Sequence, residues 1–328
     1  MNEDGQSRAP DVPIARLAID NPRETRFMRH FAASSPSAGR GWTPLERIAP
    51  RLAAGVVKAE DPRFFEHHGV DWRATARVGW VAVRRRTIVA GGSTISQQLA
   101  RNLYLTPARL ISRKLREAAL AIHIERVASK ARILELYLNL IQWGRDIWGC
   151  TEAAGRYFGK RPDQLDLFES TFLVSLVPAP AAPFSGRNAV RARRAQLSLA
   201  YQIFLSGLDG PDACAACSHR IWRLHRLVAD GMPLPGALSA SADVSADADA
   251  TLLAEVAAAL GWTLIGSDDL LASHYGRRQQ RITFDRLRAR FGDDVLLRVV
   301  RAESYAALRA RMTDEPSRVS AIDSRRES

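Results

Sequence analysis

Apolar residues recur at helical spacing along much of this chain, in stretches that end where Gly and Pro residues interrupt them. From Thr43, apolar residues at positions 45, 48, 52 and 56 follow the 3.6-residue period, which buries one stripe of a helix. That helix leads the chain into the segment Lys58-Ala59-Glu60-Asp61. Capping signals predict four further helices, at about 94–103, 106–127, 129–143 and 166–177.

The same pattern divides the chain into segments. Helical spacing continues at about 190–205 and 221–230, and no long window shows strand alternation, so we expect a predominantly α protein. The expected order is a flexible N-terminal lead-in (1–40), a main domain (41–187), a helical extension (188–238), a linker rich in Ala, Ser and Asp (239–250), a small helical region (251–312) and a tail (313–328).

Composition places the chain among ordinary globular proteins. Of its 328 residues, 46% are hydrophobic and 25% are charged, which disfavours wholesale disorder, a fibrous repeat and a polytopic membrane protein. No apolar run reaches the roughly 18 residues that a membrane-spanning helix needs. Residues 1–31 carry Arg and Asp throughout, so the sequence as written shows neither an anchor nor an export signal.

The net charge of +12 comes from one segment. Residues 51–200 hold 24 Lys and Arg against 12 Asp and Glu, whereas the rest of the chain holds 23 of each. Such a localised basic face suits phosphate groups, nucleic acid or an anionic membrane surface. Charge alone does not choose among these partners.

The first candidate for chemistry is segment 60–69, which combines carboxylates and imidazoles with aromatic residues. Glu60 and Asp61 come just before an aromatic pair. Desolvation by such neighbours raises the pKa of a carboxyl group and prepares it for acid or base work near neutral pH. A solvated acidic pair at a helix end, closed by Gly69, explains the same residues. The segment by itself leaves both interpretations open.

The second candidate is Arg113-Lys114-x-x-Glu117. In a helix, offsets of three and four residues place both cations on the same face as the carboxylate. A routine surface ion pair explains this fragment when it is taken alone.

Five motifs in order resemble those of the peptidoglycan glycosyltransferases, the family 51 enzymes, of the monofunctional biosynthetic transglycosylase type. The resemblance covers about 42–187. Its motifs are Glu60-Asp61-x-x-Phe64-x-x-His67-x-Gly69, the run from Gly91 to Asn102, Arg113-Lys114-x-x-Glu117, the run from Ile133 to Asn139 with Gly144, Gly149 and Tyr157 to Lys160, and a looser match through Glu169 and the prolines at 178–183. One motif would be weak evidence, but five at family-like separations make coincidence hard to sustain.

The resemblance implies a reaction and a set of roles. Family members polymerise lipid II into β-1,4-linked glycan strands by an inverting transfer that releases undecaprenyl pyrophosphate. Glu60 then corresponds to the general base. Glu117 corresponds to the second catalytic glutamate, which positions the pyrophosphate or holds a divalent cation (Mg²⁺ or Mn²⁺) through it. The implied substrate-binding residues are Asp61, Phe64, His67, Thr94, Gln98, Arg101, Arg113 and Lys114.

Some of these roles follow from the charge of the leaving group. Arg101, Arg113 and Lys114 match positions that stabilise the departing pyrophosphate. The helix that begins near Thr94 can also offer amide N–H groups to an anion. No organic cofactor is implied.

The resemblance also implies an architecture and a location. The family's catalytic domain is a lysozyme-like, two-lobed helical structure with a cleft between the lobes. The Arg- and Trp-rich segment 71–90 resembles the membrane-contacting part of the smaller lobe and can lie in the headgroup layer. The implied location is the outer face of the bacterial cytoplasmic membrane. The implied partners are lipid II, the growing glycan strand, the anionic membrane surface and a cell-wall synthesis protein.

Three other interpretations compete with this one. A glycan-cleaving lysozyme-like enzyme would use Glu60 as general acid, but it would have no pyrophosphate for the cations to hold. A catalytically inactive cell-wall assembly scaffold would keep the fold without the chemistry. Nucleic-acid binding through Arg84 to Arg86 or through the C-terminal region is disfavoured because that region is nearly neutral, so we expect no nucleic-acid partner. We also expect no transpeptidase domain, since its Ser-x-x-Lys and Lys-Thr-Gly motifs need lysine and none follows Lys160.

Overall fold

The computed structural model describes residues 12–31, 41–85, 92–105 and 111–242, together with the short pieces 263–264 and 270–271. The chain divides into two compact units, residues 1–184 and 185–328. The sequence predicts the end of the main domain at 187, close to this division. All candidate site residues belong to the first unit.

The first unit is helical, as predicted. Its elements are η1 (Ile14–Arg16), α1 (Arg26–Phe31), η2 (Leu45–Arg47), α2 (Pro50–Glu60), α3 (Trp72–Arg85), α4 (Ile95–Tyr104), α5 (Ile111–Val127), α6 (Lys130–Leu140), β1 (Gln142–Gly144), β2 (Ile147–Trp148), α7 (Cys150–Phe158), η3 (Pro162–Gln164) and α8 (Leu167–Leu176). The helix expected from Thr43 is interrupted, because Pro50 begins α2 after a separate 3₁₀ turn.

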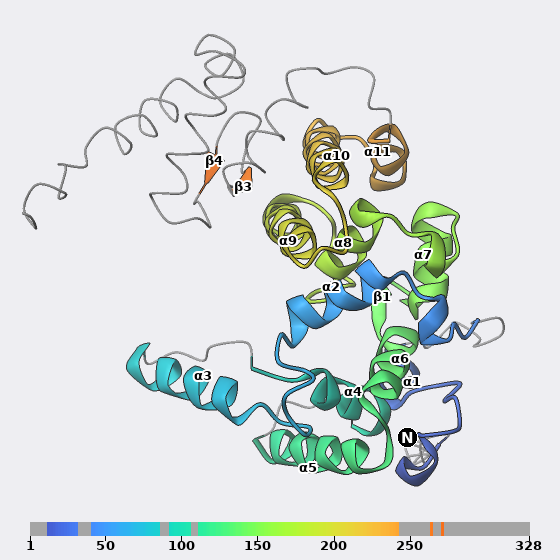
Figure 1. The fold of residues 1–328 in the computed structure, drawn as a ribbon, viewed down its shortest axis with the longest axis vertical. Helices are drawn as coiled ribbons and strands as arrows, with labels where there is room; N and C mark the ends of the chain where they lie inside the picture. The colour runs from blue at the N-terminus through green and yellow to red at the C-terminus, as the bar shows by residue number, and fades with distance from the viewer. Residues whose placement is uncertain are drawn as a thin grey trace, which may run out of the picture. The chain divides into compact units, whose positions relative to one another are not determined.

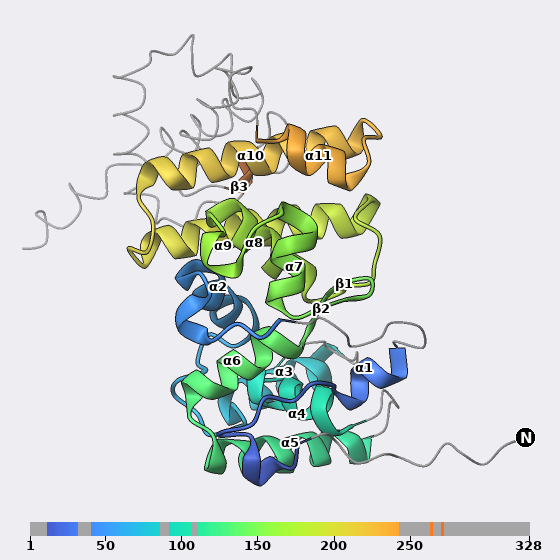
Figure 2. The ribbon, with the colours of Figure 1, turned by 90° about the vertical axis from the view of Figure 1, so that its right-hand side faces the viewer.

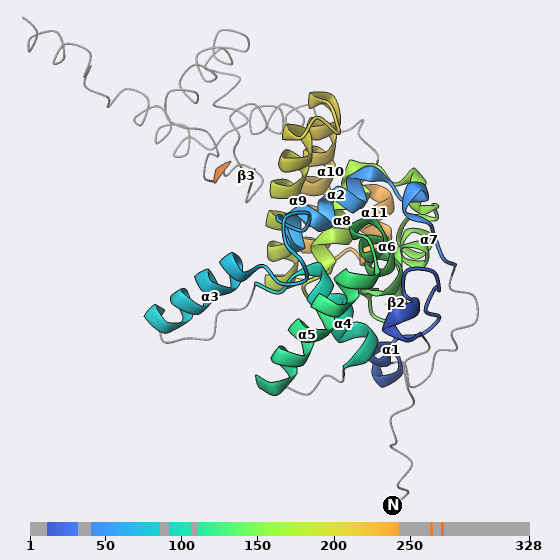
Figure 3. The same ribbon diagram turned by 60° about the horizontal axis from the view of Figure 1, so that its bottom comes forward.

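The helices of this unit form two lobes. In one lobe α4 packs against α5, and in the other α2 packs against α8 (Figure 1). Helix α6 contacts α4 and α5 on one side and α7 on the other, so it links the lobes (Figure 2). Helix α3 projects away from the rest of the smaller lobe (Figure 3). This arrangement agrees with the lysozyme-like, two-lobed fold expected from the sequence.

Three predicted helix starts are confirmed by side-chain caps. Thr94 accepts the amide N–H of Gln97, and the Gln97 side chain accepts the amide of Thr94 in return. Ser129 caps α6 through the amide N–H of Arg132. Asp166 and Glu169 form the same reciprocal pair at the start of α8. These caps use only groups three residues apart, which is why the local sequence revealed them.

The motif that contains α6 holds the chain before α2 in place. The Asn139 side chain accepts the amide of Thr43 and donates to the Thr43 carbonyl, both at 2.9 Å. The Glu135 carboxylate accepts the indole N–H of Trp42 at 3.1 Å and the amide of Leu45 at 2.9 Å. The buried side chain of Asn139 therefore holds the backbone before α2 in the lobe that contains α2 and α8, and it is not a binding group.

A short antiparallel hairpin, β1–β2, was not predicted. Its strands are two and three residues long, too short for alternation to stand out. Asp146 turns the hairpin at φ 57°. Gly149 follows at φ 77°, where a Cβ atom would stand 2.5 Å from the Asn139 carbonyl oxygen. Only glycine fits this approach, so the spacing of this motif reflects packing.

The expectation of a flexible lead-in over 1–40 is wrong for residues 12–31. Leu17 is fully buried and Met28 is 1% exposed. Arg132 of α6 donates to the carbonyl oxygens of Leu17 at 2.9 Å and Asp20 at 2.8 Å. Short turns bury single apolar residues without making a helical stripe, so periodicity did not reveal this segment. Residues 1–11 and 32–40 lie outside the described residues.

The second unit contains α9 (Gly186–Leu205), α10 (Pro211–Ala229) and α11 (Leu234–Ala240), and α9 packs against α10. The small helical region expected at 251–312 is corrected where the structure describes it, because β3 (Thr263–Leu264) and β4 (Leu270–Leu271) pair as antiparallel strands. The rest of that region, the linker from 243 and the tail lie outside the described residues. Among the described helices, none is long and apolar enough to cross a membrane.

Candidate active site

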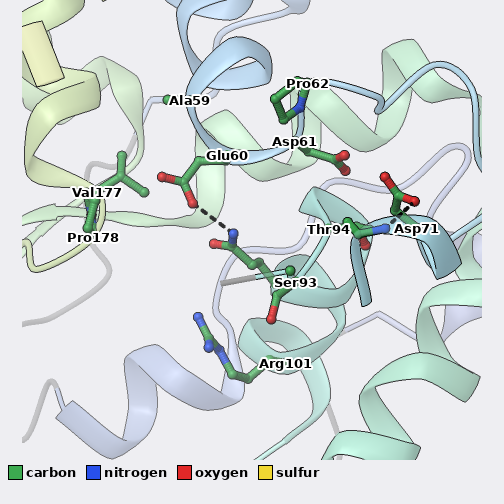
Figure 4. Close-up of a pocket in the computed structure, with 13 residues that line it drawn as sticks. Ala59, Glu60, Asp61, Pro62, Asp71, Ser93, Thr94, Arg101, Val177 and Pro178 are labelled. Carbon is green, nitrogen blue, oxygen red and sulfur yellow. Dashed lines mark hydrogen bonds between the residues drawn. The ribbon is translucent and has the colours of Figure 1, made fainter. Parts of the chain in front are cut away.

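A cavity of about 530 Å³ opens in the first unit where α2 ends, α4 begins and the chain turns after α8. Glu60 comes from the last turn of α2, and Gln98 and Arg101 come from one face of α4. Val177 and Pro178 form an apolar wall of the same cavity (Figure 4). The cavity therefore combines a carboxylate, an amide and a cation beside apolar groups.

Glu60 lies in a partly desolvated setting. Gln98 Nε2 donates to Glu60 Oε2 at 2.9 Å. Burial raises the pKa of Glu60, the Gln98 hydrogen bond and the charge of Arg101 lower it, and the neighbouring Asp61 raises it. The net direction is upward. A carboxylate with a raised pKa is a stronger base than one in open solvent, so the desolvation expected from the sequence is present.

Among the described residues that line this cavity, Arg101 is the one cation. Its guanidinium group points towards Glu60 from α4 (Figure 4). Arg101 forms no ion pair with any residue that the structure describes, and its Nε atom is buried without a hydrogen-bond partner there. A second cavity, of about 310 Å³, is lined by Gln98 and Arg101 as well, and also by Arg113 and Phe27. Arg101 thus faces both cavities and is available to an anion in either.

Asp61 is engaged within the protein. Its side chain is 4% exposed, and both of its carboxylate oxygens lie 3.0 Å from His67 Nε2. Asp61 Oδ2 also accepts the amide of Ile95, the first residue of α4, at 3.0 Å. Burial raises the pKa of Asp61, whereas the Ile95 and His67 hydrogen bonds lower it. Asp61 ties the residue after Glu60 to the start of α4.

Phe64 and His67 support this loop from behind. Phe64 is fully buried and His67 is 8% exposed. The Phe64 ring lies edge-on to the His67 ring and carries Lys130 Nζ over its face at 4.4 Å. Neither residue lines the described cavities. The structure therefore places them as supports of the loop, and not beside Glu60 and Arg101 as binding groups.

Thr94 lines the cavity, but its hydroxyl is occupied. Thr94 Oγ1 donates to the Gly69 carbonyl at 2.5 Å while it accepts the Gln97 amide at 3.1 Å. With the Ile95 amide held by Asp61, two of the first amides of α4 are taken. The amides of Ile95 and Gln97 are therefore not open to an anion, and anion binding by the start of α4 stays a prediction for its other amides. Gly69, at φ 92°, has no room for a Cβ atom, which would stand 2.8 Å from the Ile122 amide nitrogen.

The Arg113, Lys114 and Glu117 cluster forms on α5 as the helical offsets predicted. Arg113 Nε lies 3.1 Å from Glu117 Oε1, and Lys114 Nζ lies 2.9 Å from Glu117 Oε2. Lys114 also donates to Ser93 Oγ at 2.6 Å, and Ser93 lines the cavity of Glu60. The Glu117 carboxylate is 3% exposed, so this is not a routine surface pair. The cluster meets the cavity through Ser93.

Two residues near Glu60 were not predicted. The buried Tyr137 of α6 donates its hydroxyl to Gln98 Oε1 at 2.8 Å. Asp71 caps α3 through the amides of Arg73 and Ala74 and pairs with Arg63 at 3.0 Å, which holds the pKa of Asp71 below its ordinary value. In the sequence, Tyr137 is one member of an apolar helix face. A buried tyrosine hydroxyl needs a hydrogen-bond partner, and this need was the only feature of the sequence that could have indicated the contact of Tyr137 with Gln98.

Known proteins resemble this chain over the same region. The transglycosylase family model matches residues 27–202, more than half of the chain. A biosynthetic peptidoglycan transglycosylase of Aromatoleum aromaticum is 40% identical over 190 residues, 55% of this chain and 83% of that protein. Proteins of the same name from Azoarcus sp. and Chromobacterium violaceum are 40% and 36% identical, over 85% and 76% of their lengths. The chain therefore belongs to the transglycosylase family and is a peptidoglycan glycosyltransferase, an enzyme that polymerises glycan strands.

Proposed function

We propose that this protein polymerises lipid II by an inverting transfer in which Glu60 is the general base. The observation that supports this most is the pairing of a desolvated carboxylate, Glu60, with an ion-pair-free cation, Arg101, in one cavity. A transfer between sugars that expels a pyrophosphate needs both a proton acceptor and an anion stabiliser. The cavity offers them side by side.

The glycosyl transfer forms one carbon–oxygen bond and breaks another. The Glu60 carboxylate takes the proton of the acceptor's 4-hydroxyl as that oxygen attacks the anomeric carbon of the donor. The new carbon–oxygen bond forms on the face opposite the departing pyrophosphate, so the α-linked donor gives a β-1,4 bond. The electron pair of the broken bond leaves with undecaprenyl pyrophosphate, and Glu60 later releases its proton to water.

The cations stabilise the charge that develops on the leaving group. Arg101 faces the cavity without a competing carboxylate partner among the described residues. Arg113 and Lys114 are held by Glu117, which fixes their side chains before substrate arrives. A preorganised cation stabilises the transition state without rearranging during the reaction. Glu117 acts here as a positioning group for the two cations.

The described residues do not form a metal site of their own. Both oxygens of Glu117 are paired with cations, and the described residues contain no group of three or more His, Cys, Asp or Glu that could hold an ion. A Mg²⁺ or Mn²⁺ ion would therefore be held mainly by pyrophosphate oxygens of the substrate. No step above depends on it.

Hydrolysis of glycan by a lysozyme-like mechanism fits the cavity less well. Such enzymes use a second carboxylate across the scissile bond from the acid. The other described carboxylates of the cavity are Asp61 and Asp71, and both are committed to helix caps and ion pairs.

The test is to incubate the full chain with detergent-dispersed lipid II and a divalent cation, and separately with finished sacculi. We expect polymeric glycan and stoichiometric release of undecaprenyl pyrophosphate in the first reaction. Sugar fragments from the sacculi would favour the hydrolase instead. No product from a folded protein in either reaction would favour the inactive scaffold.

We also propose that α3 binds the outer face of the cytoplasmic membrane, where lipid II is met. Trp72 and Trp80 are 66% and 61% exposed on this helix, and the Arg84 guanidinium lies 5.1 Å above the Trp80 ring. On neighbouring α5, Leu115 is 71% exposed. Exposed Trp beside Arg suits an anionic headgroup layer. Helix α3 projects from its lobe in a way that would reach such a surface (Figure 3).

Replacing Trp80 by alanine should weaken binding to anionic phospholipid vesicles by about 10- to 150-fold, because burying one large apolar side chain contributes roughly 1.5–3 kcal/mol. Vesicle co-sedimentation of the full chain measures this partitioning. The matched control is Leu205→Ala, an exposed apolar residue of the second unit. Equal loss in both variants, or none in either, would contradict interfacial binding by α3.

A further inference from the structure

Glu60 is the end of a chain of two hydrogen bonds that starts on α6. The Tyr137 hydroxyl donates to Gln98 Oε1 at 2.8 Å, and Gln98 Nε2 donates to Glu60 Oε2 at 2.9 Å. Tyr137 is fully buried, and 39 residues of sequence separate it from Gln98. The three side chains come from α6, α4 and α2. The chain therefore joins the linking helix to the catalytic carboxylate.

The direction of this chain depends on how the Gln98 amide is turned. An amide can present either its N–H₂ donors or its carbonyl acceptor to a neighbour. With the N–H facing Glu60, the amide stabilises the ionised carboxylate. With the carbonyl facing Glu60, the amide would instead accept a hydrogen bond from the neutral acid, and the pKa of Glu60 would rise. The orientation of one amide therefore favours either a base or an acid at this position.

Tyr137 selects one of these orientations. In the observed arrangement, its hydroxyl proton is bonded to Gln98 Oε1, which turns that oxygen away from Glu60. If the amide flipped, the Tyr137 hydroxyl would face N–H donors, and its own proton would need another acceptor. The structure records no other hydrogen bond of this hydroxyl among the described residues. A buried donor without a partner is unfavourable, so the flip is opposed.

We propose that Tyr137 is a positioning residue, whose hydroxyl fixes the Gln98 amide and thereby keeps Glu60 ionised as the base of the glycosyl transfer. This inference rests on the proposed role of Glu60. It assigns to Tyr137 a part in catalysis through Gln98, without contact with substrate. It also gives a physical reason why this carboxylate works as a base on a lysozyme-like fold, where the corresponding group can be an acid.

Other charged groups also act on Glu60. Arg101 of α4 lowers its pKa, and Asp61, the next residue, raises it. Val177 and Pro178, after α8, are apolar and desolvate it. Tyr137 itself stays neutral, because burial raises the pKa of its hydroxyl well above the ordinary value. Removing that hydroxyl alters no charge, so any change in the titration of Glu60 must come through the amide.

The decisive variant is Tyr137→Phe, which removes only the hydroxyl. We expect the acid limb of the pH–rate profile for polymerisation to move to higher pH by about half to one pH unit. At pH values below this limb the polymerisation rate should fall by about threefold to tenfold, and at higher pH it should change little. KM should change little. In a Gln98→Leu background the same substitution should add no further shift, because no amide is left to orient. Fluorotyrosine at position 137 keeps the ring and donates more strongly, so it should move the limb downward.

The matched control is Tyr157→Phe. Tyr157 is a half-buried tyrosine whose hydroxyl lies 3.4 Å from the Trp143 carbonyl and makes no contact with Gln98. An equal shift in this variant, or a lower rate at every pH with the limb unmoved in Tyr137→Phe, would show that Tyr137 is merely structural.

A second readout separates this proposal from the function itself. Carboxyl-carbon NMR of the full chain with labelled glutamate titrates Glu60 directly, its signal being identified by its loss in Glu60→Gln. The titration midpoint should rise in Tyr137→Phe whether or not polymer is made. An unmoved midpoint overturns the positioning role. Absence of polymer from the wild type, with the midpoint shifted, would overturn only the proposed function.

Discussion

Replacing Glu60 by glutamine should lower the rate of lipid II polymerisation by about 10²–10⁴-fold, the range that a positioned general base contributes. Glutamine keeps the shape of the side chain and can still accept the N–H of Gln98, but it cannot take the proton of the acceptor hydroxyl. Release of undecaprenyl pyrophosphate, measured for both proteins at saturating lipid II, checks this. The matched control is Glu66→Gln, since Glu66 lies in the same loop with its side chain 62% exposed. Polymerisation by Glu60→Gln at the wild-type rate would contradict the assignment.

The same variant should not lose stability. Burial raises the pKa of Glu60, so the folded protein binds this proton more tightly than the unfolded chain does. The contribution of Glu60 to stability is then full below the unfolded-state pKa and is lost as pH rises through the higher folded-state pKa. Above the folded-state pKa the ionised side chain opposes folding, and a neutral glutamine removes that cost. We expect an equal or higher melting temperature, which also shows that lost activity is not lost fold.

Replacing Arg101 by alanine should lower polymerisation by about 10²–10³-fold, as expected when one preorganised group that stabilises transition-state charge is removed. The loss should fall mainly on kcat, because the negative charge develops on the pyrophosphate as it leaves. Arg101→Lys should retain much of the rate, since it keeps the charge while losing the planar fork. Steady-state kinetics with lipid II measure all three proteins.

We also expect the Arg101→Ala substitution to shift the pH dependence of the polymerisation rate. The positive charge of Arg101 lowers the pKa of Glu60. Without it, that pKa rises further, and the acid limb of the pH–rate profile should move to higher pH. Arg116→Ala is the control, because Arg116 is an exposed cation of α5 that lines neither described cavity. A similar rate loss in the control would mean that general basic charge matters, and not the position of Arg101.

The starts of α4, α6 and α8 were readable from the sequence, because their caps are local. The hydroxyl of Thr94 and the carboxylate of Asp166 accept hydrogen bonds from amides three residues away, so the capping residue and its partner lie in the same short stretch of sequence. The N-terminal segment was not readable in this way. Leu17 and Met28 are held by α6, α4 and α5, whose positions no local pattern reveals.

The sequence also pointed to residues that line one cavity, but it did not show how each polar side chain is used. Glu60, Gln98 and Arg101 meet in one cavity, as the motifs implied. Asp61, His67 and Thr94 belong to the same motifs, yet their polar atoms are consumed in holding the loop to α4. A motif records that a residue type is needed at a position. It does not distinguish a group that faces the cavity from one that holds the backbone beside it.

The sequence by itself determined the helical class, the starts of α4, α6 and α8, the family and the carboxylate and cations from which a site can be built. These follow from periodicity, from caps and from residue types at fixed spacing, all of which are properties of short stretches. The tertiary structure alone decided which way each polar side chain turns. Gln98 faces Glu60 with its N–H because Tyr137, 39 residues away, holds the opposite side of its amide. Arg101 stays free for an anion because Asp61 and Asp71 are occupied elsewhere. Such choices depend on which hydrogen-bond partners remain after the chain has packed, and those partners are distant in sequence.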